Sequence, residues 1–194
     1  KKDNDVHPTY IKKEDFLKNG QMGFNMTTLD PYLLSPPEEI HSVFTLSNTT
    51  LEQFQVDDLV LKTRIKHYSS KSDPACMRVL LLLKGEHGRA SVPIISEGCY
   101  GNSAIGFGER VITGKTNDLS ALTTDLTVYT EVRMAVKNNT VELYVGDNAP
   151  YTFSYERTLG TLKVAKVIIN GLGSVDAFAI SDGAYTYKED FDLN

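Results

Sequence analysis

The stretch VYTEVRMAVKNNTVELYV, residues 128–145, decides the fold class. Apolar and polar side chains alternate up to Asn138-Asn139, and the alternation resumes after this pair. A period of two puts successive side chains on opposite faces of a strand. Two asparagines tolerate the positive φ angles that a two-residue hairpin turn requires. The stretch therefore predicts an antiparallel hairpin in which Arg133 lies opposite Tyr144. The face expected in the core consists of Val128, Thr130, Val132, Met134, Val136, Val141, Leu143 and Val145.

The same strand-like pattern continues on both sides of this hairpin. Residues 58–68 alternate in the same way, with Lys62, Arg64 and Lys66 on the polar face. About ten short strands with one apolar face each, and no helical period longer than two turns, predict two packed antiparallel sheets. We therefore expect an all-β sandwich. Its later strands are expected at Tyr151–Tyr155, Leu162–Asn170 and Ser174–Ser181.

The first part of the chain differs from the rest. Residues 1–20 are polar and lysine-rich, with one short helix candidate over Tyr10–Lys18, and prolines interrupt residues 30–37. We expect residues 1–42 to be an irregular segment that packs on the sandwich, and residues 43–194 to be the sandwich itself. Residues 1–194 are expected to form a single domain, because sandwiches of about 200 residues commonly do so.

Composition and charge exclude two classes of partner. The formal net charge is −5, and such a surface repels the phosphates of nucleic acids. The longest apolar run is Val79–Leu83, far short of the roughly 20 residues that a membrane span needs. We expect neither nucleic-acid binding nor a membrane span in this chain.

The two cysteines, Cys76 and Cys99, flank two expected strands that are joined by a turn at residues 85–88. In an antiparallel hairpin they would lie nearly opposite each other, at a separation that suits a disulfide. The alternative is two buried thiols. A disulfide would indicate an oxidising compartment, so the expected location is periplasmic or extracellular.

Three stretches resemble the concanavalin A-like superfamily of jelly rolls, which includes laminin G-like domains, lectins and laminarinase-type glycoside hydrolases. They are residues 130–146, 166–171 and 173–180, and the resemblance covers Val43 to Phe191. The last segment also resembles uncharacterised cell-envelope proteins of Bacteroidetes. The resemblance implies an antiparallel two-sheet jelly roll in an envelope or secreted protein, and it leaves lectin, hydrolase and adhesion functions open.

The sequence departs from the hydrolases of that superfamily. Their E-x-D-x-x-E or E-x-D-x-E pattern, which aims two carboxylates at one substrate, is absent. We therefore expect no catalysis, and the leading hypothesis is a carbohydrate-binding or adhesion module. The alternatives are a structural or protein–protein interaction domain of a larger envelope protein and an unusual glycoside hydrolase.

Candidate ligand-binding residues follow from the expected outward faces. The chain has no tryptophan, so tyrosines paired with cations are the candidates for stacking on a sugar. Lys166 and Asn170 lie on the strand that resembles the concave sheet, and we expect them to share a groove. The competing interpretation is an ordinary solvated surface. The full candidate set is Arg64, Tyr129, Arg133, Tyr144, Lys166 and Asn170.

No cofactor is expected. The four histidines are scattered, and none has a partner at metal-ligand spacing. Calcium stays open as an alternative, because several aspartates fall in expected loops, although no spacing resembles a defined calcium loop. These loop residues are Asp118, Asp125, Asp147, Asn148 and Asp182.

Overall fold

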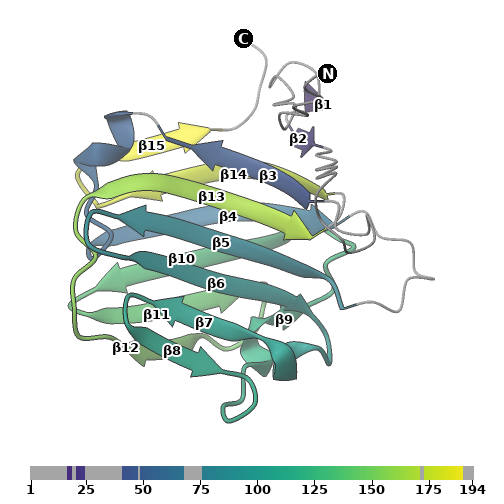
Figure 1. Ribbon diagram of the computed structural model, residues 1–194. Helices are drawn as coiled ribbons and strands as arrows, with labels where there is room; N and C mark the ends of the chain where they lie inside the picture. Colours follow the sequence, from purple (N-terminus) through teal and green to yellow (C-terminus); the bar gives the residue numbers. More distant parts are fainter. Residues whose placement is uncertain are drawn as a thin grey trace, which may run out of the picture.

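Two sheets packed face to face form the protein (Figure 1). The computed structural model describes residues 17–18, 21–24, 41–47, 49–67, 76–170 and 173–189. Every strand pair is antiparallel among these residues except β6 (Arg89–Ser96) with β9 (Thr123–Thr124). The predicted all-β sandwich is confirmed, and the only helices among the described residues are short 3-10 turns. These are η1 (Thr49–Gln53), η2 (Tyr100–Asn102) and η3 (Ser120–Leu122).

The first sheet, called the β4 sheet here, carries the hairpin predicted from residues 128–145. Strand β15 (Thr186–Glu189) pairs with β14 (Gly173–Ser181) and stands outside the main path, the linear strand order of this sheet. The path runs β1 (Leu17–Lys18), β2 (Gln21–Phe24), β14 (Gly173–Ser181), β4 (Leu59–His67), β10 (Thr130–Lys137), β11 (Thr140–Val145), β12 (Tyr151–Ser154).

The second sheet, called the β5 sheet, faces the viewer in Figure 1. Strand β9 (Thr123–Thr124) pairs with β6 off the main path. Neighbouring strands in both sheets are often distant in sequence, as the crossovers of a jelly roll require. The path runs β3 (His41–Leu46), β13 (Leu162–Asn170), β5 (Arg78–Gly85), β6 (Arg89–Ser96), β7 (Ala104–Phe107), β8 (Arg110–Thr113).

Inward side chains of both sheets make one continuous apolar core. Phe44 of β3 packs against Phe178 of β14 with ring centroids 5.3 Å apart, and Phe107 packs against Tyr155 at 4.5 Å. Each large side chain buried in this way stabilises the fold by about 1.5–3 kcal/mol. The core therefore joins the two sheets.

The expected alternation is confirmed along β4, β10 and β11, where every second residue is buried. Arg133 pairs with Tyr144 as predicted, and Asn138 and Asn139 have φ angles of 51° and 57°. The prediction is wrong for Val128, whose side chain is 54% exposed. This residue precedes β10 and belongs to a turn, since its amide donates to the carbonyl of Asp125. The strand period therefore does not yet apply to it.

The N-terminal segment contributes strands where we expected irregular structure. Strand β2 pairs with β14 and so extends the β4 sheet, and β3 begins at His41. Pairing with an exposed strand edge satisfies backbone groups that an irregular segment would leave to water. The helix candidate over Tyr10–Lys18 is wrong at Leu17 and Lys18, which form β1, and its other residues lie outside the described part. The single-domain division stays a prediction.

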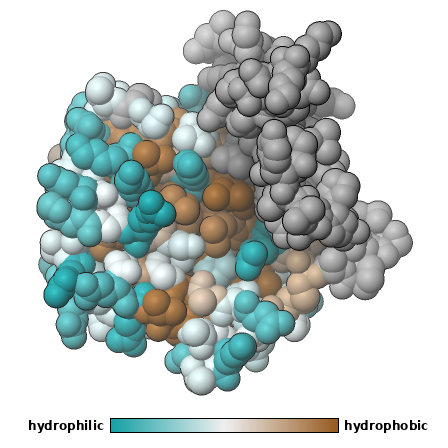
Figure 2. Space-filling view, viewed as in Figure 1, coloured by the Kyte–Doolittle hydropathy of each residue, from teal (hydrophilic) through white to brown (hydrophobic). Residues whose placement is uncertain are grey.

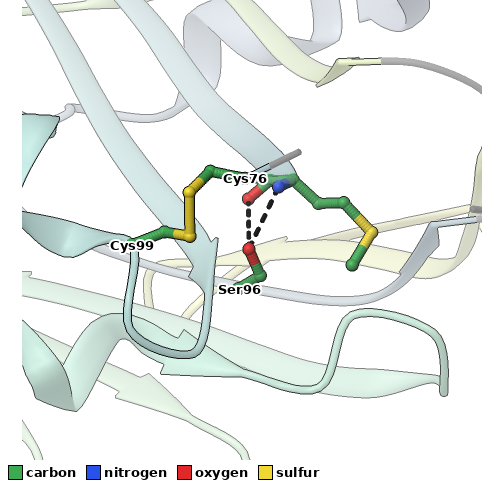
Figure 3. The surroundings of a disulfide bond; sticks show 4 residues. Cys76, Ser96 and Cys99 are labelled. Atoms are coloured by element: carbon green, nitrogen blue, oxygen red, sulfur yellow. Dashed lines mark hydrogen bonds between the residues drawn. A yellow bond between two sulfur atoms is a disulfide. The ribbon is translucent and has the colours of Figure 1, made fainter. Parts of the chain in front are cut away.

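The predicted disulfide between Cys76 and Cys99 is present, with Cα atoms 5.7 Å apart (Figure 3). It lies just beyond the paired part of the β5–β6 hairpin. The Ser96 hydroxyl accepts a hydrogen bond from the Met77 amide and donates one to the Met77 carbonyl. The disulfide and the serine together hold the start of β5 to the end of β6.

The turn of the same hairpin is also tightly constrained. The Gly85 amide donates to the Gly88 carbonyl, and a Cβ added at Gly85 would lie 2.3 Å from the carbonyl oxygen of Leu159. Only glycine fits at this crossing of two backbone segments.

In the described residues, no helix has the length and apolar character needed to cross a membrane.

Candidate functional site

A groove of about 400 Å³ crosses the outer face of the β4 sheet. Its floor consists of small side chains from three neighbouring strands, Ser181 of β14, Val60 of β4 and Ala135 of β10. The register pairs Val60 with both Ser181 and Ala135, so the three lie in one row across the sheet. On β4 and β10 the outward residues beside this row are longer, with Lys62 beside Val60 and with Arg133 and Lys137 beside Ala135, so the row is hollow there. The groove therefore runs across the strands.

Polar side chains line the groove on both sides of this floor. Along β10, Ala135 is flanked by Arg133 and Lys137, and the next strand adds Thr140 and Glu142. The volume falls within the range of about 300–1,000 Å³ that small-ligand sites occupy. Two more acidic residues, Asp58 and Asp182, line the groove from the loops at the ends of β4 and β14.

One tyrosine connects two of the charged groove residues. The Arg133 guanidinium lies over the ring of Tyr144, 4.7 Å from its centroid, and the Tyr144 hydroxyl donates a hydrogen bond of 2.6 Å to Glu142. This hydrogen bond to Glu142 raises the pKa of Tyr144, so the phenol stays protonated. Arg133 and Glu142 are therefore both held by a side chain that does not itself line the groove.

At the β14 end, a tight turn fixes Asp182. Its carboxylate accepts hydrogen bonds from the amides of Tyr185 and Ala184, which lower its pKa. The carboxylate is therefore ionised at neutral pH and is partly satisfied by backbone donors.

A second cluster lies on the same face around Tyr129. Arg64 and Lys66 both approach its ring, at 5.2 and 5.5 Å from the centroid, and its hydroxyl is hydrogen-bonded to that of Ser174 over 2.6 Å. Ser174 lies on β14, on the far side of β4 from Tyr129, so the phenol reaches across β4. Arg64 also pairs with Asp176 at 2.8 Å. This ring is engaged by its neighbours rather than presented to a ligand.

The basic stripe predicted on β4 does face outward, but its charge is largely compensated. Lys62 pairs with Glu131 at 3.3 Å, in addition to the pairing of Arg64 with Asp176. Exposed pairs of this kind contribute roughly 0–1 kcal/mol each to stability. Their main effect here is to lower the local positive potential.

The six candidate residues do not form one site. Arg64, Tyr129, Arg133 and Tyr144 lie on the β4 sheet, whereas Lys166 and Asn170 lie on β13 of the β5 sheet. The two sheets turn their outer faces in opposite directions, so Lys166 and Asn170 are remote from the groove. Of the six, only Arg133 lines it. The expectation that Lys166 and Asn170 share a groove with each other stays a prediction; both lie at half-buried, outward positions of β13.

The outer face of the β5 sheet, seen in Figure 2, has a different character. Apolar side chains gather over its middle. The half-buried, outward positions of β5 and β13 include Leu80, Leu82 and Ile168, of which Leu80 and Ile168 are register partners. Lys166 lies beside Leu82 on this face. The two faces of the sandwich thus differ: one has a polar groove and the other an apolar centre.

The sequence pattern did not single out Val60, Ala135, Glu142 or Ser181, and it considered Asp182 only as a loop residue for calcium. A signal was present, since Val60 and Ala135 are small residues at outward positions of alternating strands. It becomes visible only when the register of β14, β4 and β10 is known. No group of three or more His, Cys, Asp or Glu side chains in the described residues is arranged to hold a metal ion.

Comparison with known proteins shows the fold. No protein-family model and no curated protein sequence matches the chain. Among solved structures, the metal-free carbohydrate recognition domain of Emp46p superposes with a TM-score of 0.54 at 10% identity, covering 86% of this chain and 84% of that one. The corresponding domain of Emp47p gives 0.50 at 11% identity, covering 87% and 90%.

A third similar structure is the carbohydrate-binding module CBM66 from Bacillus subtilis, with a TM-score of 0.47 at 8% identity, covering 90% of this chain and 99% of that one. The superpositions on the Emp46p and Emp47p domains show that the protein has a concanavalin A-like jelly-roll fold, as the resemblance implied. The resemblance to cell-envelope proteins of Bacteroidetes stays a prediction.

Proposed function

We propose that the protein is a non-catalytic carbohydrate-binding module whose glycan lies in the groove of the β4 sheet. The observation that carries the proposal is the row of small residues, Ser181, Val60 and Ala135, bordered by polar side chains. The carbohydrate recognition domains of Emp46p and Emp47p share the fold, which makes this ligand class the first to test.

The chemistry of the groove suits a sugar. Each sugar hydroxyl both donates and accepts hydrogen bonds, and the groove offers charged donors on Arg133 and Lys137 with acceptors on Asp58 and Glu142. Val60 and the Ala135 methyl group give the floor an apolar surface for ring C–H groups. Ligand sites commonly combine such an apolar surface with a few well-placed polar groups.

Two features support the rest of the proposal. The sequence lacks the paired-carboxylate pattern of the related hydrolases, which favours binding without turnover. The disulfide between Cys76 and Cys99 favours an oxidising location, periplasmic or extracellular, in an envelope or secreted protein.

The alternative is a structural or protein–protein interaction domain. The half-buried leucines Leu80 and Leu82 on the outer face of the β5 sheet support it.

The test is calorimetric titration with a panel of oligosaccharides, using wild type and a variant with a filled groove. Ala135→Phe puts a ring on the floor between Val60 and Glu142, and we expect it to weaken binding at least about tenfold. Lys166→Ala, on the opposite face, is the matched control and should leave the affinity unchanged. Equal affinity of Ala135→Phe and wild type, or no binding by wild type at millimolar sugar, would contradict the proposal.

A further inference from the structure

The groove holds opposite charges at fixed positions around one small residue. Ala135 pairs with Glu142 on β11, and Arg133 lies two residues before Ala135 on the same face of β10. Diagonal neighbours in an antiparallel pair have Cα atoms roughly 7–8 Å apart, so both long side chains can reach one ligand ring over Ala135. A sugar at this point would meet a donor along the strand and an acceptor across it.

Tyr144 fixes both of these groups at once. Its ring lies under the guanidinium of Arg133, and its hydroxyl donates to the carboxylate oxygen Oε2 of Glu142. Tyr144 is half-buried and directly opposite Arg133 in the register. A long cation and a carboxylate would otherwise sample several rotamers, and ordering them on binding costs about 0.5–1.5 kcal/mol per side chain.

The groove carries a net negative charge. Among the described residues that line it, Asp58, Glu142 and Asp182 are acidic, and Arg133 and Lys137 are basic, a formal net charge of −1. An anionic group over Ala135 would be attracted by the guanidinium of Arg133. The carboxylate of Glu142 would repel it, because like charges at such separations repel. Neutral hydroxyls can use both groups without this penalty.

We infer that Tyr144 positions Arg133 and Glu142 as a preorganised donor and acceptor, and that this pair makes the groove select neutral glycans over acidic ones. The inference rests on the proposed glycan binding at the same groove. In this account Tyr144 is a positioning residue, and Arg133 and Glu142 contact the sugar.

The test compares two classes of probe at constant ionic strength, because screening changes charge effects. Cellohexaose, laminarihexaose and mannohexaose are the neutral probes, and hexagalacturonate and hexamannuronate are the acidic ones. Wild type should bind at least one neutral probe and should bind the acidic probes at least about tenfold more weakly. Acidic probes that bind as well as neutral ones would overturn the inference but not the proposed function. Absence of binding to every probe would overturn both.

Three variants distinguish a positioning role of Tyr144 from a general effect on the stability of the protein. Glu142→Gln should shift the neutral-to-acidic affinity ratio about tenfold toward the acidic probes, because it removes the repelling charge. Tyr144→Phe keeps the ring under Arg133 but releases Glu142, and it should weaken neutral binding about fivefold. Glu131→Gln is the control, since it changes the net charge equally on the same face but lies outside the groove and pairs with Lys62. Its affinities should match wild type; if all three variants behave alike, the positioning role is wrong.

Discussion

Tyr155 donates a hydrogen bond of 2.6 Å to the carboxylate of Asp57, which lies 98 residues earlier in the chain. The same carboxylate accepts hydrogen bonds from the amides of Leu159 and Gly160, at 2.8 to 3.0 Å. Asp57 comes just before β4, and the three donors lie in the connection from β12 to β13. One carboxylate thus ties the start of the central groove strand to the connection that leads into the opposite sheet.

Asp57→Ala should be among the more destabilising single substitutions in the described part of the protein. It leaves two backbone amides and a buried hydroxyl without their acceptor, which costs about 2–4 kcal/mol. Chemical denaturation followed by circular dichroism measures the loss. Asp58→Ala is the control, because the neighbouring carboxylate is exposed and should change the free energy of unfolding by less than about 0.5 kcal/mol. Equal effects of the two substitutions would contradict the role of Asp57.

The burial of Tyr155, and its hydrogen bond to Asp57, raise the pKa of the phenol well above its ordinary value. In the unfolded chain the phenol loses its proton near pH 10 or so. A folded-state pKa above the unfolded one gives stability that is complete below about pH 10 and is lost as the pH rises further. The difference in unfolding free energy between wild type and Tyr155→Phe should therefore shrink from pH 8 to pH 11 or so. A difference that is constant or grows with pH would be inconsistent with a buried neutral phenol.

The hairpin between β10 and β11 depends on positive φ angles at its turn, 51° at Asn138 and 57° at Asn139. Asn138→Val introduces a β-branched side chain into the left-handed region and should destabilise the protein by about 1–2 kcal/mol. Asn138→Gly should be neutral within about 0.5 kcal/mol, because glycine adopts this conformation freely. Thermal unfolding of the two variants checks the difference, and a valine variant as stable as the glycine variant would speak against this turn.

The disulfide closes a loop with a sequence separation of 23 residues. Replacing both cysteines, as Cys76→Ser with Cys99→Ser, should lower the free energy of unfolding by about 3 kcal/mol. Wild type unfolded without reductant should show no reactive sulfhydryl in a thiol titration, and two after reduction. Two reactive sulfhydryls before reduction would show that the bond does not form.

The alternation of apolar and polar residues was enough to predict those features that depend only on strands adjacent in sequence. The alternation from Thr130 to Val145 and the Asn138-Asn139 turn determine one register, so the pairing of Arg133 with Tyr144 could be predicted. The disulfide also followed from one hairpin. These features need only contacts between strands that are adjacent in sequence.

The groove depends instead on which distant strands become neighbours. Val60 lies beside Ser181 only because β4 pairs with β14, strands more than 100 residues apart, and this pairing is a property of the whole topology. A β-bulge between Asp176 and Ala179, with Ala177 at a φ of 52°, also shifts the register before Ser181 reaches the groove. Neither pairing nor bulge is encoded in the alternation of a single strand, which is why the six predicted residues were spread over both sheets.

The glycan is proposed to occupy the outer face of the β4 sheet. Backbone amide NMR spectra of isotope-labelled protein, titrated with the best-binding neutral oligosaccharide, locate the bound sugar residue by residue. We expect the largest shift changes at Val60, Ala135, Glu142 and Ser181, with Leu82 and Lys166 on the opposite sheet unchanged. Shift changes centred on Leu82 and Lys166, with none at Val60 and Ala135, would place the glycan on the β5 sheet and rule out the proposed site.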